Sequence, residues 1–217
     1  MSTNINSFKN HTRMPPIDAG SYPAVCNGII DLGVQITTIE GKIKNVPQIL
    51  ICWEFPEETD QETTKRRSLS RIFTSSINEG SKLRDTLKAW RGRDFTDEEK
   101  KDFDLKKFIG EPCIVTVTHK TKNKITFAEI SGVTKIMLGQ TVAQPETRLH
   151  FDTDDKSTWA IFPELPGWVR NKINENEDWK QLGIMLSPKG EAIERPSKQK
   201  EQVLSNNDKM LDGDLPF

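Results

Sequence analysis

Residues 48–55 have the sequence QILICWEF, which is one of the longest apolar runs in the chain. Eight residues suit a strand and are far too few to cross a membrane. The run shows little alternation with polar residues, so we expect a strand that lies mostly within a hydrophobic core. Trp53 and Phe55 point to one side of this strand and Cys52 and Glu54 to the other, because successive side chains alternate.

Strands are also predicted on both sides of this run. Residues 21–37 mix β-branched and apolar side chains, and Gly28 and Gly33 stand where a bent or bulged strand requires glycine. Residues 66–77, RRSLSRIFTSSI, form the next strand after a polar loop at 57–65. The front of the chain is therefore predicted to be mainly β.

A helical segment follows these three strands. Residues 78–90 carry apolar side chains at i, i+4 and i+7, the spacing of one helix face, and Asn78 is the expected capping residue. Residues 96–110 predict a second short helix that begins at Thr96 and ends at Gly110. Both helices interrupt the β pattern without replacing it.

Two more strands complete the pattern, at residues 112–120 and 124–137, and the basic turn KTKNK joins them. Three strands, helical residues and two further strands predict an α+β protein that is mainly β with helical insertions. The arrangement favours a five-stranded Greek-key barrel of the oligonucleotide/oligosaccharide-binding (OB) type, with a short helical appendage and a disordered tail. A β-sandwich or another α+β sheet stays an alternative.

Composition divides the chain into four expected parts. These are a flexible N-terminal arm at 1–16, the OB-type domain at 17–138, a linker with a short helical segment at 139–186, and a disordered tail at 187–217. Within the helical segment we expect Trp168 to pack with Val169, Ile173 and Trp179. The N-terminus lacks the apolar stretch of a signal peptide, so we expect a cytoplasmic protein that does not enter a membrane.

Charge is unevenly distributed along the chain. Residues 1–138 carry 21 Lys and Arg against 18 Asp and Glu, a net charge of +3. Residues 139–217 carry 10 against 14, a net charge of -4. A basic front and an acidic rear are a weak indication of a polyanionic partner.

Catalytic patterns are absent from the sequence. The three histidines, His11, His119 and His150, lie far apart, and the three cysteines lie singly inside apolar runs. The sequence also lacks a glycine-rich phosphate loop. We therefore expect no enzyme, no metal and no cofactor, although a metal-dependent DNA-processing nuclease built from distant carboxylates stays an alternative.

Cations and aromatic residues alternate in three segments, at residues 65–73, 88–95 and 119–127. Single-strand binding requires cations for phosphates and flat aromatic rings for unpaired bases. The predicted contacts are Trp53, Lys65, Arg66, Arg67, Arg71, Phe73, Arg91, Arg93, Lys120, Lys122, Lys124 and Phe127. Alternatively, Phe73 lies in the core and the lysines only solvate a turn; for Trp90, on the apolar helix face, we favour the core.

The chain ends in DGDLPF, an acidic and apolar peptide. It resembles the carboxy-terminal tip of bacterial and phage single-stranded DNA-binding proteins. The resemblance implies a handle for replication or recombination proteins, in which the phenyl ring enters an apolar pocket and the carboxylates meet basic residues. The residues concerned are Asp212, Asp214, Leu215, Pro216 and Phe217.

A longer resemblance covers residues 82–120, flanked by 49–58 and 127–133, and extends to residues 164–180. These segments are similar to a family of phage-encoded single-stranded DNA-binding proteins with OB folds. The family implies sequence-tolerant coating of single strands in phage DNA replication, recombination or repair, in the host cytoplasm, and self-association on DNA. An OB-fold module that binds proteins instead of DNA is the remaining alternative.

Overall fold

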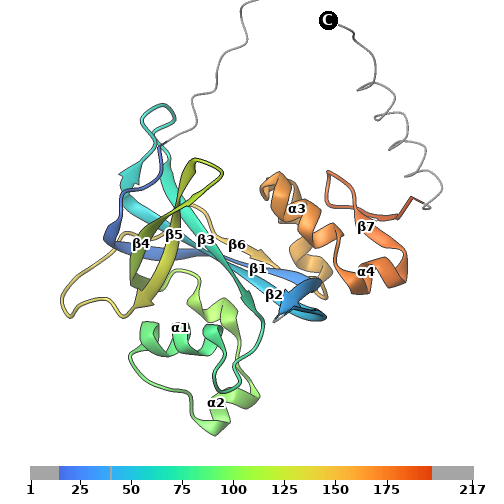
Figure 1. The fold of residues 1–217 in the computed structure, drawn as a ribbon, viewed down its shortest axis with the longest axis horizontal. Coiled ribbons are helices and arrows are strands. Elements are labelled where there is room, and N and C mark those ends of the chain that lie inside the picture. The colour runs from blue at the N-terminus through green and yellow to red at the C-terminus, as the bar shows by residue number, and fades with distance from the viewer. Residues whose placement is uncertain (1–14, 40, 197–217) are drawn as a thin grey trace, which may run out of the picture.

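The computed structural model describes residues 15–39 and 41–196, and it shows a mainly β protein with helices, as predicted (Figure 1). Five long strands form, namely β1 (Gly20–Ile39), β2 (Lys42–Thr59), β3 (Arg66–Thr74), β4 (Pro112–Lys122) and β5 (Ile125–Thr134). They pair antiparallel in the order β3-β2-β1-β4-β5. A further strand, β6 (Leu149–Phe151), pairs with β1 in the parallel direction.

The helices form two groups. Between β3 and β4 lie α1 (Lys82–Arg91), α2 (Asp97–Lys101) and the 3-10 helix η1 (Leu105–Phe108). After β6 come the 3-10 helix η2 (Lys156–Glu164), α3 (Gly167–Asn174), α4 (Glu177–Leu182) and the hairpin of β7 (Ile184–Leu186) and β8 (Ala192–Glu194). Figure 1 shows the first group below the sheet and the second beside the far end of β1 and β2. No helix in the described part of the chain is long and apolar enough to cross a membrane.

Capping side chains begin helices α1 and α2. The hydroxyl of Thr96 accepts the backbone N–H of Glu99, and the Glu99 carboxylate accepts the N–H of Thr96. This capping box confirms the predicted start at Thr96. The other helix begins later than predicted, because Ser81 caps it and Asn78 does not.

Strand β1 contains two irregularities, one between Cys26 and Gly28 and one between Asp31 and Gly33. The sequence predicts a bend or bulge at both glycines, and the structure confirms this. Gly33 has a φ of 67°, and a Cβ there would lie 2.7 Å from the Cβ of Asn176. Glycine is therefore required where β1 passes the start of α4.

The run QILICWEF is apolar on both faces because it separates two hydrophobic cores. Its odd-numbered residues face the first core, which also contains residues of α1, β1, β4 and β5: Ile49, Ile51, Trp53 and Phe55. Leu50 faces the second core, where Ile30 and Leu32 of β1 meet side chains of η2, α3 and α4. A strand buried on both faces has no polar side, which explains the missing alternation.

The second core corrects the prediction for the rear of the chain. Residues 149–166, expected in a linker, form β6 and η2, and Phe151, Trp159 and Phe162 are buried against β1 and β2. These aromatic residues are few, but each covers a large apolar area. Strand β8 lies within the segment that was expected to be disordered. Residues 1–14 of the predicted arm and residues 197–217 of the predicted tail lie outside the described residues.

The long sheet is open at its edges. Strands β3 and β5 each pair with a single neighbour in the residues that the structure describes. The two edges nevertheless approach each other, because Nη1 of Arg71 on β3 donates a hydrogen bond to the carbonyl of Ile130 on β5 at 3.3 Å. The sheet therefore curves so that its first and last strands meet at one side chain.

Candidate nucleic-acid interface

The turn between β4 and β5 consists of Asn123 and Lys124, flanked by the facing residues Lys122 and Ile125. Both turn residues have a positive φ, 51° for Asn123 and 62° for Lys124. Two left-handed residues in a two-residue loop define a type I′ hairpin, whose twist matches that of the strands. The tight basic turn predicted from the sequence is therefore present.

Cations and apolar side chains share one face of this hairpin. Lys120 stands opposite Phe127, and Lys122 stands opposite Ile125. Directly opposed residues of an antiparallel pair point to the same face, and residues two apart on one strand do so as well. Val115 and Val117 point to the first core, so the face with Lys120 and Lys122 is the outer one. We call Lys120, Lys122, Lys124, Ile125 and Phe127 the hairpin patch.

The hairpin patch is open to solvent and positively charged. Ile125 is 46% exposed and Phe127 is 36% exposed, so both apolar side chains are accessible. The carboxylate of Glu129 lies 3.7 Å from Nζ of Lys120. Lys122 and Lys124 form no ion pair within residues 15–39 and 41–196. Two ammonium groups beside accessible apolar surface are therefore free to meet a ligand.

Arg66 is engaged within the protein. Its guanidinium lies 3.0 Å from the carboxylate of Glu54 and 3.4 Å from that of Glu146, and it donates to the carbonyl of Gln144 at 2.9 Å. Glu54 is buried and also accepts the backbone N–H of Glu146 at 3.1 Å. A buried carboxylate requires such partners. Arg66 therefore attaches the segment before β6 to β2, which is a structural role.

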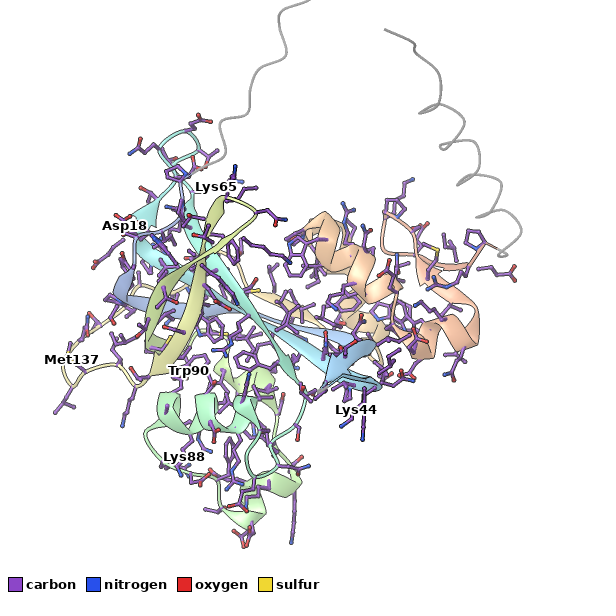
Figure 2. All side chains as sticks on the ribbon, in the orientation of Figure 1. Asp18, Lys44, Lys65, Lys88, Trp90 and Met137 are labelled. Carbon is purple, nitrogen blue, oxygen red and sulfur yellow. The ribbon has the colours of Figure 1, made fainter. Side chains whose placement is uncertain are left out.

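The other predicted cations of β3 differ in accessibility. Arg67 donates a hydrogen bond to the carbonyl of Pro15 at 2.6 Å. Arg71 donates to the carbonyl of Ile130, and its guanidinium carbon also lies 5.1 Å from the ring centroid of Phe73. Both arginines are half-buried, whereas Lys65 is exposed. Figure 2 shows Lys65 at the end of the sheet toward which the β4–β5 hairpin extends. Lys65 is thus the residue of this group best placed to extend the hairpin patch.

The structure contradicts the predicted stacking roles of Trp53 and Phe73. Trp53 is 0% exposed and its ring centroid lies 5.8 Å from that of Trp90. Phe73 is 3% exposed and belongs to the same core. Both side chains point inward because the alternation of β2 and β3 directs them to α1 and not to solvent. Trp90 lies in the core, as favoured from the sequence, and its indole N–H donates to the carbonyl of Pro112.

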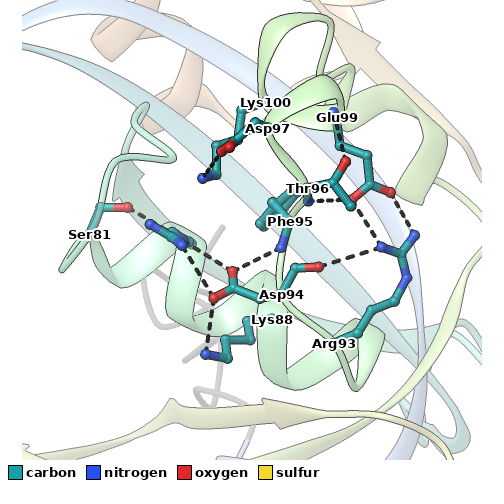
Figure 3. A network of polar contacts seen from close by, with 10 residues as sticks. Ser81, Lys88, Arg93, Asp94, Phe95, Thr96, Asp97, Glu99 and Lys100 are labelled. Carbon is teal, nitrogen blue, oxygen red and sulfur yellow. Dashed lines mark hydrogen bonds and ion pairs between the residues drawn. The ribbon is translucent and has the colours of Figure 1, made fainter.

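Arg91 and Arg93 are occupied by one carboxylate. Each places a guanidinium nitrogen 2.6 Å from Oε1 of Glu99, and Figure 3 shows the bonds of Arg93. Hydrogen bonds from Arg93 first and Arg91 second hold the pKa of Glu99 well below its usual value. Arg84 and Lys88 do the same for Asp94. These pairs fix the loop between α1 and α2, so the two predicted contacts are engaged within the helical insertion.

The three cysteines are buried or half-buried thiols. Burial raises the pKa of the Cys26 and Cys52 thiols to about 12, so both thiols are protonated at neutral pH and unreactive. Cys113 is buried as well, and its pKa is raised for the same reason. Within the described residues, no group of three or more His, Cys, Asp or Glu could hold a metal ion. The predicted tip, residues 212–217, lies outside the described residues.

The sequence interpretation missed two exposed residues. Ile125 belongs to the hairpin patch because it pairs with Lys122. The sequence contains a signal for this pairing, since Lys122 and Ile125 flank the predicted two-residue turn. Trp168 was expected to pack, but it is 50% exposed on α3. The sequence carries no signal for this, because Trp168 precedes the buried Val169 and either residue could have faced the core.

A search of the chain against models of protein families finds no match, and a search of curated proteins finds none either.

Proposed function

We propose that this protein binds single-stranded DNA through the hairpin patch and performs no chemistry on it. The arrangement that carries the proposal is the outer face of the β4–β5 hairpin, where Lys120 lies opposite Phe127 and Lys122 lies opposite Ile125. Lysines neutralise phosphates, and an exposed phenyl ring stacks on a base of any sequence. This set of groups favours a sequence-tolerant single-strand binder over a reader of duplex DNA.

The backbone of Lys124 supports the same proposal. A positive φ is unfavourable for lysine by roughly 1 kcal/mol, and glycine usually occupies this position of a type I′ turn. A strained residue at an exposed position indicates a functional constraint when its side chain has a use. The side chain of Lys124 adds a third ammonium group at the turn of the hairpin.

The strand order supports a five-stranded OB-type barrel. Strand β1 pairs with both β2 and β4, the edges β3 and β5 meet at Arg71, and the helical insertion lies between β3 and β4. In such barrels the face of the second and third strands and the loops after strands one and four bind oligonucleotides. The second core covers part of the β1–β2 face here, which favours the β4–β5 loop as the principal contact.

The biological role follows from this binding mode. A protein that contacts phosphates and stacks on any base coats single strands during replication, recombination or repair, as the resemblance to phage-encoded single-stranded DNA-binding proteins implies. The tip at residues 212–217 would recruit replication or recombination proteins to the coated strand. Self-association along DNA is part of the same proposal.

Fluorescence anisotropy of a labelled thirty-nucleotide poly(dT) strand tests the proposal. We expect saturable binding at low salt that weakens steeply as salt rises, and an intact strand after incubation with magnesium or manganese. Absence of binding at low salt would exclude the proposed function. Metal-dependent cleavage of the strand would support the nuclease alternative instead.

A further inference from the structure

Trp168 differs from the other four tryptophans of the chain. It is 50% exposed, whereas Trp53, Trp90, Trp159 and Trp179 are between 0% and 8% exposed and lie in the two cores. Burying an aromatic side chain stabilises a fold more than burying a small aliphatic one, because it removes a larger apolar area from water. An exposed tryptophan therefore suggests a binding role. Among the described residues, the Trp168 side chain forms no hydrogen bond, aromatic pair or cation–π contact.

Trp168 lies on α3, which is a basic helix, whereas the module formed by residues 149–196 is acidic as a whole. Helix α3 has the sequence GWVRNKIN, with Arg170 and Lys172 and no carboxylate, and its Val169 and Ile173 are buried in the second core. Residues 149–196 as a whole carry six Lys and Arg against nine Asp and Glu. A polyanion would therefore be repelled from most of this module and attracted to α3.

Trp168 and Lys172 are four residues apart, so their side chains are neighbours on one side of α3. Lys172 in turn contacts β1: its carbonyl accepts a hydrogen bond from Nε2 of Gln35 at 2.9 Å, and its Nζ lies 3.3 Å from Oε1 of Gln35. The side chain of Gln35 thus marks the face of the β1–β2 ribbon that is turned toward α3.

Two exposed lysines continue along this face of the ribbon. Thr37 and Ile39 point to the same side as Gln35, and they pair with Lys44 and Lys42 respectively. The ribbon therefore extends a row of cations from Lys172 through Lys44 to Lys42. We call Trp168, Lys172, Lys44 and Lys42 the α3 surface.

We propose that the α3 surface is a second binding site for the single strand, in which Trp168 stacks on an unpaired base and the three lysines contact the adjacent phosphates. The inference rests on the proposed function, because it takes single-stranded DNA as the ligand. The hairpin patch likewise presents an exposed aromatic ring, that of Phe127, beside ammonium groups. In Figure 1 the free end of the β4–β5 hairpin and α3 both lie in the upper part of the view.

Fluorescence and affinity measurements on three variants test this site. Poly(dT) of thirty nucleotides should quench the tryptophan emission of the wild-type protein, and Trp168→Phe should remove most of this quenching while the strand still binds. Trp168→Ala should weaken binding of the labelled strand by about 5- to 150-fold, the loss expected for one stacked base. Leu182→Ala, at an exposed apolar residue of α4 in the same module, is the matched control and should change neither readout.

The outcomes separate this inference from the proposed function. If the wild-type protein does not bind the strand, the proposed function is wrong and this site is wrong with it. If the wild-type protein binds but Trp168→Ala binds equally well, the α3 surface is not a strand site and Trp168 serves another contact, such as a protein. Should Trp168→Ala fail to fold by circular dichroism, the Trp168→Phe quenching decides, and unchanged quenching would overturn the inference.

Discussion

Lys120 and Phe127 stand directly opposite each other on the outer face of the β4–β5 hairpin. Side chains at such positions lie within about 5.5 Å at their Cβ atoms, so an ammonium group and a phenyl ring are presented together. A nucleotide also presents two chemical surfaces together, a charged phosphate and a flat base. The pair therefore matches one nucleotide with one cation and one ring, and each part can be removed separately.

Phe127→Ala should weaken binding of poly(dT) by about 1–3 kcal/mol, because one stacking surface is lost. The salt dependence of binding should not change, since no cation is removed. Anisotropy titrations at several salt concentrations measure both quantities. Phe127→Trp is the matched control and should bind at least as well as the wild type; a loss in this variant equal to that of alanine would argue against stacking.

Lys124→Gly should raise the melting temperature by about 2–4 °C, because glycine relieves roughly 1 kcal/mol of backbone strain at the positive φ. The same substitution should lower the affinity for single-stranded DNA, because one ammonium group is lost. Thermal unfolding and anisotropy measure the two effects. Lys124→Asn separates them, since asparagine tolerates this conformation and carries no charge; unchanged affinity in both variants would remove Lys124 from the hairpin patch.

Phe73→Ala should lower the free energy of unfolding by about 3–5 kcal/mol, because Phe73 is buried in the first core and alanine leaves a cavity. Denaturant unfolding measures this loss. Phe127→Ala provides the comparison, since Phe127 is exposed and should cost little stability. A small loss for Phe73→Ala, combined with weaker DNA binding by the folded variant, would restore the stacking role that the burial contradicts.

Acid should remove the contribution of Glu99 to stability. The pKa of Glu99 is lowered in the folded protein, chiefly by hydrogen bonds from Arg93 and Arg91. Glu99 therefore stabilises the fold most when its carboxylate is ionised in the folded and in the unfolded state. This stabilisation is complete above the unfolded value of about 4.3 and is lost as pH falls below it. The melting temperature of Glu99→Gln should therefore lie below that of the wild type at pH 7 and approach it toward pH 2.

Glu98→Gln is the control for this pH experiment. Glu98 is exposed, next in sequence to Glu99, and forms no ion pair in the described ranges 15–39 and 41–196. Its substitution should leave the melting temperature close to that of the wild type at each pH. A difference between Glu99→Gln and wild type that stays constant from pH 7 to pH 2 would contradict the role of the ion pairs.

Local signals in the sequence predicted much of the sheet. Gly28 and Gly33 mark the irregularities of β1, Thr96 caps α2, and the basic turn joins β4 to β5, because each of these features depends on residues close in the chain. The continuous apolar run at 48–55 also indicated a buried strand. The second core that explains its apolar outer face was not predicted, since that core depends on residues about a hundred positions away.

The candidate site was predicted less well than the fold. Lys120, Lys122, Lys124 and Phe127 come together as expected, because one hairpin carries all of them. The sequence predicts phosphate contacts for Arg66, Arg91 and Arg93 as well. In the structure each of these arginines forms an ion pair with a carboxylate of the protein. Glu99 lies only eight and six positions from Arg91 and Arg93, but the sequence does not show which of several nearby carboxylates turns back to them. The direction of Trp53 and Phe73 depends on the position of α1.

The central claim, that the hairpin patch binds the phosphates of a single strand, is tested most directly by the salt dependence of poly(dT) binding. The triple variant Lys120→Ala, Lys122→Ala, Lys124→Ala should bind more weakly than the wild type. The slope of log K against log salt should become shallower by about 2, which is the change expected for three lost phosphate contacts on a single strand. Lys101→Ala, at an exposed lysine of α2, should leave the slope unchanged. Equal affinities and equal slopes for the triple variant and the wild type would contradict the account.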